Sequence, residues 1–156
     1  MTAGQPPPPA AASSPSAAPP AYGPPISLAS ARRVMFAAEG EADAHGWRMV
    51  IAIVDSGGSL VMLHRLDQAN LGAVEIAQRK AAAAVNFRRP TKVFEDLLIA
   101  GGAGLRMLAF GPELLPVEGG VPLIEKGLVI GAIGVSGMQS SQDAQVAVAG
   151  ARSLGE

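Results

Sequence analysis

The sequence predicts a single α+β domain in which an antiparallel sheet is flanked by helices, and three observations support this prediction. Segments typical of helices and strands follow one another in the order α-β-β-α-α-(β)-β-β-α. The strand-like segments form two local pairs, each with a short turn between its members, which favours hairpins over the βαβ rhythm of a parallel sheet. The chain of 156 residues is long enough for one domain with a substantial core.

The first 25 residues differ from the rest in composition. They contain nine of the 13 prolines, and Arg32 is the first charged side chain. Because proline fixes φ and removes an amide donor, residues 1–25 are expected to form a disordered or extended Pro/Ala-rich tail, followed by a domain over residues 26–156. The alternative is an arm that lies on a neighbouring subunit, with Tyr22 as its anchor. The tail lacks the pattern of a signal peptide, so a cytoplasmic location is expected.

The domain is expected to begin with a helix and a β-hairpin. Ser27 can cap a helix of apolar residues at helical spacing, and Gly46 can end it. Residues 49–54 (MVIAIV) form the short apolar run of a central strand. Asp-Ser-Gly-Gly at 55–58 predicts a tight turn, after which residues 59–65 return as the hairpin partner.

Two helices and an irregular connection are expected next. Residues 72–86 consist almost entirely of helix formers, and the alanines at 81–84 would let a sheet or a second subunit come close. Thr91 can cap a further helix over residues 92–100. A glycine-rich connection follows, with room for one short strand over residues 105–109.

The last third of the chain returns to strands and ends in a helix. Residues 121–124 and 128–135 flank a turn and are expected to form the second hairpin. On one face of its second strand the side chains shrink from Ile130 to Ser136, which is expected to leave space for a ligand. A final helix is predicted over residues 141–154.

The composition restricts the partners. Apolar residues make up 49% of the chain and charged residues 16%, and no run is long enough to span a membrane, so self-association is expected to cover the apolar surplus. The net charge is −1 without a concentrated basic face, which argues against nucleic acid. There is no cysteine, and the two histidines do not have a metal-ligand spacing, so no metal site is expected.

Four blocks of the sequence resemble the GlcG/HbpS-like family. They read GWRMVIAIVDSGGSLVMLHRLDQA, IAQRKAAAAVNFRRPTKVFE, LLPVEGGVPLIEKGLVIGAIGVSG and QDAQVAVAG, and they run from about residue 27 to residue 153. The resemblance implies a profilin-like fold with a five-stranded antiparallel sheet and assembly into dimers or higher oligomers. Several members bind haem, so the resemblance also implies a small-molecule pocket for which haem is a candidate cofactor.

By position in these blocks, the resemblance points to a set of candidate site residues. They are Arg65, Asp67, Lys80, Thr91, Glu118, Gly119, Gly120, Gly134, Ser136, Gly137 and Asp143. The ligand site is expected where the HRLD segment, the helix that carries Lys80 and the EGGVP and GVSG segments converge, near a subunit boundary.

The types of these residues suit an anionic ligand. Arg65 and Lys80 can receive a carboxylate or a haem propionate. Glu118 can act as a general base, with the amides of Gly119 and Gly120 holding an oxyanion. His64, which ends the second strand, is the first candidate for an axial haem ligand.

Each candidate also has a structural explanation. The charged side chains can pair with one another, and a lone histidine on an apolar face can simply be packed. Asp143 lies three residues after Ser140, which is the spacing of a capping box at the start of the last helix.

Three functions remain open from the sequence. The first is a haem- or small-molecule-binding module that acts as a carrier or sensor. The second is a cofactor-free enzyme, an isomerase or lyase-type catalyst of proton transfer on a small carboxylated metabolite, with Glu118 or Lys80 as acid or base and Arg65 as carboxylate clamp. The third is a structural subunit of a larger assembly. A fold by itself does not decide between them.

Overall fold

The computed structural model describes residues 18–155 of the chain. Its elements are α1 (Leu28–His45), β1 (Val50–Asp55), β2 (Leu60–Arg65), α2 (Ala73–Phe87), α3 (Lys92–Ala100), the 3₁₀ segment η1 (Gly102–Glu113), β3 (Gly120–Glu125), β4 (Leu128–Ser136) and α4 (Ser140–Arg152). The expected order of elements is confirmed with one exception. No strand forms over residues 105–109, because Gly101 and Gly102 take positive φ and turn the chain into η1.

The sheet is antiparallel and has four strands in the order β2-β1-β4-β3. The expectation of five strands is therefore wrong. Past the end of β1, the N-terminal segment lies beside β4. There it makes only a single parallel bridge, between Tyr22 and Val129. A longer ladder cannot form because prolines at 19, 20, 24 and 25 supply no amide hydrogen.

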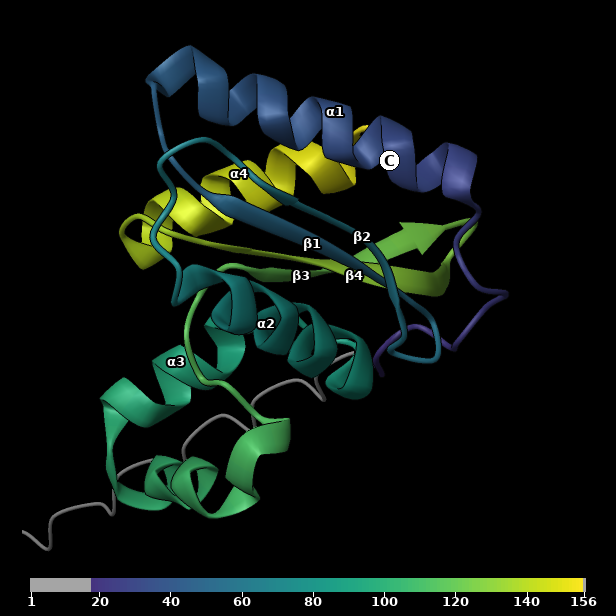
Figure 1. The fold of residues 1–156 in the computed structure, drawn as a ribbon. Helices are drawn as coiled ribbons and strands as arrows, with labels where there is room; N and C mark the ends of the chain where they lie inside the picture. Colours follow the sequence, from purple (N-terminus) through teal and green to yellow (C-terminus); the bar gives the residue numbers. More distant parts are fainter. Residues whose placement is uncertain (1–17, 156) are drawn as a thin grey trace, which may run out of the picture.

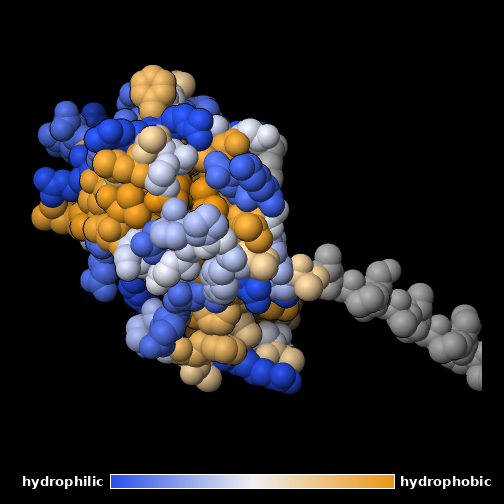
Figure 2. Space-filling view, turned by 90° about the vertical axis from the view of Figure 1, so that its right-hand side faces the viewer, coloured by the Kyte–Doolittle hydropathy of each residue, from blue (hydrophilic) through white to orange (hydrophobic). Residues whose placement is uncertain are grey.

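Helices cover both faces of the sheet, as Figure 1 shows. The helices α1 and α4 lie on one face over the largest core cluster, and α2 lies on the other. The segments α3 and η1 form a further layer outside α2, and Figure 2 shows hydrophobic residues at the surface of this lower end of the molecule. In α2, Ala81, Ala83 and Ala84 are buried within this one chain, so its alanine run leaves no free face for a second subunit.

The close packing of α2 on β4 corrects the expected ligand space on that strand. A Cβ at Gly134 would lie 2.0 Å from the carbonyl oxygen of Ala77, so the small residues of this face receive the backbone of α2. Ile130 belongs to the opposite face, in the core beneath α1. The pairing of β3 with β4 shifts between Leu123 and Ile124, and this bulge reverses the alternation of side chains.

The capping residues expected from the sequence are confirmed for α1 but not for α4. Ser27 accepts a hydrogen bond from the amide of Ser30, and Gly46 ends α1 with φ of 66°, so both expected caps of α1 are confirmed. At the start of α4 the capping box consists of Gln139 and Gln142 instead of Ser140 and Asp143. Asp143 is buried, and its carboxylate has a different partner.

Candidate functional site

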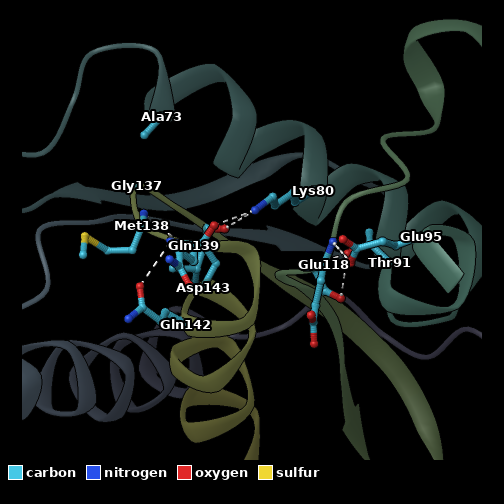
Figure 3. A network of polar contacts seen from close by, with 12 residues as sticks. Ala73, Lys80, Thr91, Glu95, Glu118, Gly137, Met138, Gln139, Gln142 and Asp143 are labelled. Atoms are coloured by element: carbon cyan, nitrogen blue, oxygen red, sulfur yellow. Dashed lines mark hydrogen bonds and ion pairs between the residues drawn. The ribbon is translucent and has the colours of Figure 1, made fainter. Parts of the chain in front are cut away.

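The centre of the predicted site is a buried ion pair between Lys80 and Asp143 (Figure 3). Lys80 Nζ lies 2.8 Å from Asp143 Oδ2 and donates a second hydrogen bond to the carbonyl oxygen of Val135 at 3.0 Å. The other carboxylate oxygen, Oδ1, accepts the amide of Met138. Lys80 is 1% exposed and Asp143 2%. Lys80 is thus held inside the protein, away from a ligand at the surface, and neither its expected role as acid or base nor that of a cation for an anionic ligand has support from this arrangement.

The two glycines of the EGGVP block are also interior. Gly120 donates its amide to Thr91 Oγ1 at 2.9 Å, and its carbonyl oxygen accepts the amide of Thr91. A Cβ at Gly119 would lie 2.8 Å from Lys80 Nζ, which explains why this position has no side chain. The expected oxyanion hole is therefore incorrect for Gly120, whose amide already has a partner.

Glu118 is the member of this block that reaches the surface. Its backbone amide is held by the carboxylate of Glu95 at 3.0 Å, while its side chain lines an open groove of about 460 Å³ (Figure 3). We call this the Glu118 groove. It runs along the exposed face of α4, and its other lining residues are Glu41, Ser141, Ala144, Gln145, Val148, Ala149 and Arg152.

The surroundings of Glu118 shift the pKa of its carboxyl upward. Partial burial raises the pKa of its carboxyl above the ordinary value, and the nearby carboxylates of Glu95 and Asp96 raise it further. The charges of Lys92 and, to a smaller extent, Lys80 lower this pKa. A carboxyl group of this kind is suited to exchange protons with a bound molecule.

A second group of predicted residues lies away from the Glu118 groove, where β2 and β4 end. It consists of Arg65, Asp67 and Ser136. Arg65 pairs with Val50, and Val50 pairs with Ser136, so Arg65 and Ser136 share one row about 10 Å apart across three strands. Asn70 Nδ2 donates to the carbonyl oxygen of Gly137. The structure therefore brings the HRLD and GVSG segments together as expected, but Glu118 lines a different groove from Arg65.

His64 lies at the edge of the sheet beside this row. It lines an open pocket of about 450 Å³ together with Glu39, Leu63, Arg65, Leu66 and Asp67, which we call the His64 pocket. Nδ1 of the half-exposed imidazole lies 2.5 Å from Glu39 Oε1 on α1. The contact orients the ring, and because a carboxylate oxygen only accepts, Nδ1 is the nitrogen that donates a proton in it.

Two partners of the predicted residues were not expected from the sequence. Glu39 orients His64, and Glu95 holds the loop of Glu118. Neither has a local sequence signal, because each contact joins elements that meet only after the helices pack on the sheet. Among residues 18–155, no three side chains of the metal-binding types gather into a cluster.

A four-stranded antiparallel sheet between two helical layers, with open grooves at its rim, defines this protein as a small α+β domain with room for a surface-bound ligand. The chain belongs to the HbpS-like family, because the family model described as haem degrading protein HbpS-like matches residues 26–152.

Known relatives agree with this assignment. Protein GlcG of Escherichia coli is 39% identical over 111 residues, which cover 71% of this chain and 81% of GlcG. The crystal structure of an HbpS double mutant from Streptomyces reticuli has a TM-score of 0.77 at 32% identity and covers 93% of this chain and 99% of its own. A PduOC:haem complex has a TM-score of 0.76 at 26% identity, with coverage of 84% and 96%.

Proposed function

We propose that this protein binds haem at the His64 pocket and acts as a haem-binding module, in the manner of a carrier or sensor. The observation that carries the proposal is the contact between His64 Nδ1 and Glu39 Oε1. A carboxylate that accepts the Nδ1 proton leaves Nε2 directed away as a ligand and makes the imidazole a stronger donor to a metal. Iron in haem is commonly held by one such histidine.

The surroundings of His64 fit the rest of a haem. Leu66 provides an apolar wall on the α1 side, and Phe36 lies one helical turn from Glu39 with 79% of its surface exposed. Arg65 lines the same pocket and can pair with a propionate. An apolar surface, a metal ligand and a cation are groups that can contact the ring, the iron and the propionates of haem. Bound haem would supply the redox chemistry of its iron, while these residues bind and orient it.

The relatives support the same ligand class. The matching family is described as haem-degrading, and PduOC has been crystallised as a haem complex. We extend haem binding from these relatives to this chain as a proposal, and the His64 pocket is the part of the chain on which it can be tested.

A haemin titration followed by the Soret absorbance tests the proposal. Wild-type protein is expected to bind haemin with a shifted Soret band, and His64→Ala is expected to lose that band. His45→Ala is the matched control, because His45 is similarly exposed and has a carboxylate neighbour on the same helix. Glu39→Gln is expected to weaken binding by about 10–100-fold, the usual effect of losing a residue that orients a metal ligand. Arg65→Ala is expected to cost on the order of 1–3 kcal/mol of binding.

The possible outcomes distinguish an error in the proposed haem site from an error in the proposed function. Wild-type binding that His64→Ala leaves intact would show that haem binds elsewhere on the chain. Absence of any specific binding by the wild type would refute the proposed function itself.

A second function, proton transfer on a small carboxylated metabolite, is favoured by the raised pKa of Glu118 in its groove. Because Lys80 and the Gly120 amide are occupied, Glu118 is left as the acid or base, and Arg152 at the other end of the groove is the cation. Incubation with simple 2-hydroxy and 2-keto acids in D₂O, followed by NMR, detects exchange of their carbon-bound protons. Exchange is expected with the wild type and not with Glu118→Gln, and equal rates for both would exclude this role.

A further inference from the structure

A third hollow of the surface lies next to the His64 pocket, at the end of the molecule where α1 passes into β1 (Figure 1). Its volume is about 430 Å³. This value falls within the range of roughly 300–1,000 Å³ that is typical of small-molecule sites. We call it the Trp47 pocket, and the side chains that line it are Asp43, Trp47, Arg48, Leu66, Asp67 and Gln68.

The backbone holds the walls of the Trp47 pocket in place. On one side, the amide of Trp47 donates to the carbonyl oxygen of Ala42 at the end of α1, and its ring stacks on His45 with 4.1 Å between the centroids. On the other side, the amide of Leu66 donates to the carbonyl oxygen of Met49 at 2.9 Å, which ties the turn after β2 to the start of β1. A ligand would therefore meet a pocket that is already formed and would lose little free energy in ordering it.

The charged side chains of the Trp47 pocket have both signs and do not satisfy one another. Asp43 and Asp67 supply two carboxylates, and Arg48 supplies a guanidinium group. Within residues 18–155, none of these three side chains belongs to an ion pair. The guanidinium thus stands apart from both carboxylates around one hollow, and this separation leaves room for a molecule that carries both charges.

Asp43 is at an unfavourable position for the helix that carries it. It lies in the last turn of α1, where the helix dipole places negative partial charge, so its carboxylate is repelled by the helix end. His45, the base of this turn, stacks on Trp47 and contacts the carbonyl oxygen of Glu41. The helix end and the carboxylates of Asp43 and Asp67 together attract a positive group, and a bound ammonium would remove the repulsion.

We infer that the Trp47 pocket binds a small zwitterion of the type of a free α-amino acid with an apolar side chain. The ammonium group of the ligand is bound between Asp43 and Asp67, and its carboxylate pairs with the planar guanidinium of Arg48. The apolar side chain of the ligand packs on Trp47 and Leu66, which are half-buried and lie against the core. Beside these apolar walls the charges interact more strongly than they would in open water.

A zwitterion fits this lining better than a molecule with one charge. A simple amine would leave Arg48 without a partner, and a simple carboxylic acid would meet the two carboxylates of the pocket. The site is also independent of the proposed haem function. Leu66 and Asp67 line both pockets, but neither His64 nor Glu39 lines the Trp47 pocket, and its test contains no haemin.

Titration of the full chain with L-leucine, followed by tryptophan fluorescence and by calorimetry, tests the inference. Trp47 is the single tryptophan of the chain, so a saturable change in its emission is expected for the wild type. Asp43→Asn and Arg48→Gln are each expected to weaken binding by about 10–100-fold, the scale of one charge-assisted hydrogen bond. Arg32→Gln and Asp96→Asn are the matched controls, because both side chains are exposed and lie outside the pocket.

Analogues of leucine give a second measurement that does not depend on how a variant folds. L-leucinamide lacks the carboxylate and N-acetyl-L-leucine lacks the ammonium group, so each is expected to bind the wild type about 10-fold or more weakly than L-leucine. Arg48→Gln is expected to lose the preference for L-leucine over L-leucinamide and to keep the preference over N-acetyl-L-leucine.

Three results would overturn the inference. The first is the absence of a saturable signal from the wild type up to about 10 mM L-leucine. The second is equal affinity of the wild type for L-leucine and both analogues. The third is equal binding of L-leucine by the two pocket variants and the two control variants.

Discussion

Lys80 Nζ and Asp143 Oδ2 lie 2.8 Å apart, although the helices that carry them cover opposite faces of the sheet. The lysine side chain reaches α4 past the start of β3, where Gly119 has no side chain to block it. The pair thereby joins α2 to the first turn of α4 through the interior. Burial raises the pKa of the Asp143 carboxyl, and the hydrogen bond from Lys80 opposes that rise.

We expect single changes in this pair to be strongly destabilising. Asp143→Asn leaves the Lys80 ammonium buried without a counter-charge, which costs about 3–5 kcal/mol of unfolding free energy. Lys80→Met leaves the carboxylate unpaired, with a similar cost. The double variant Lys80→Met/Asp143→Leu removes both charges and is expected to recover most of the loss. Urea denaturation of the four proteins measures the coupling, and additive effects of the two single changes would contradict it.

The N-terminal segment is predicted to contribute to stability from residue 18 onward. The Tyr22 hydroxyl donates to the carbonyl oxygens of Val85 and Asn86, and Arg88 donates to the carbonyl oxygen of Pro20 while lying over the Tyr22 ring. Tyr22 thus anchors the segment on its own domain. The first 17 residues of the expected tail lie outside the described part of the chain.

Two deletions test this anchor. Removal of residues 1–25 is expected to lower the melting temperature by several degrees relative to removal of residues 1–17, because only the first deletion takes away the contacts of Tyr22. Tyr22→Phe in the full chain is expected to cost about 0.5–1.5 kcal/mol, the net value of one hydrogen bond. Equal melting temperatures for both deletions would show that the anchor contributes nothing.

Local patterns were sufficient to predict most of the fold. Ser27 and Gly46 marked α1 correctly, and both hairpins followed from apolar runs around turn residues. Patterns failed where a distant residue decides the structure. Asp143 fits a capping box by spacing, yet it pairs with a lysine 63 residues away. The sequence predicts His64 as a candidate ligand, but the glutamate that orients it is 25 residues earlier, on a helix whose packing the sequence does not reveal.

The small residues on β4 make a further prediction about packing. Gly134→Ala would place a Cβ 2.0 Å from a backbone oxygen of α2, so α2 must move away from the sheet at a cost of about 3 kcal/mol or more. Gly40→Ala is the control: Gly40 is in the middle of α1 with nothing within 4 Å of the added methyl group. This second change is expected to raise stability by about 0.5–1 kcal/mol, because alanine loses less backbone entropy in a helix. Equal effects of the two changes on urea unfolding would contradict the close approach.

The pH dependence of stability follows from Glu118. Burial raises the pKa of its carboxyl above the 4.5 of an unperturbed glutamate, so the folded protein retains the proton at pH values where the unfolded chain has released it. As pH rises from about 4.5 through the folded-state pKa, this group therefore makes a declining contribution to stability. Glu118→Gln has no proton to lose. The melting temperature of Glu118→Gln relative to the wild type is thus expected to rise with pH across that interval and to level off above it. Differential scanning calorimetry between pH 4 and pH 8 gives this difference directly, and a difference that is constant or falls with pH would show that the Glu118 carboxyl is not desolvated in the folded protein.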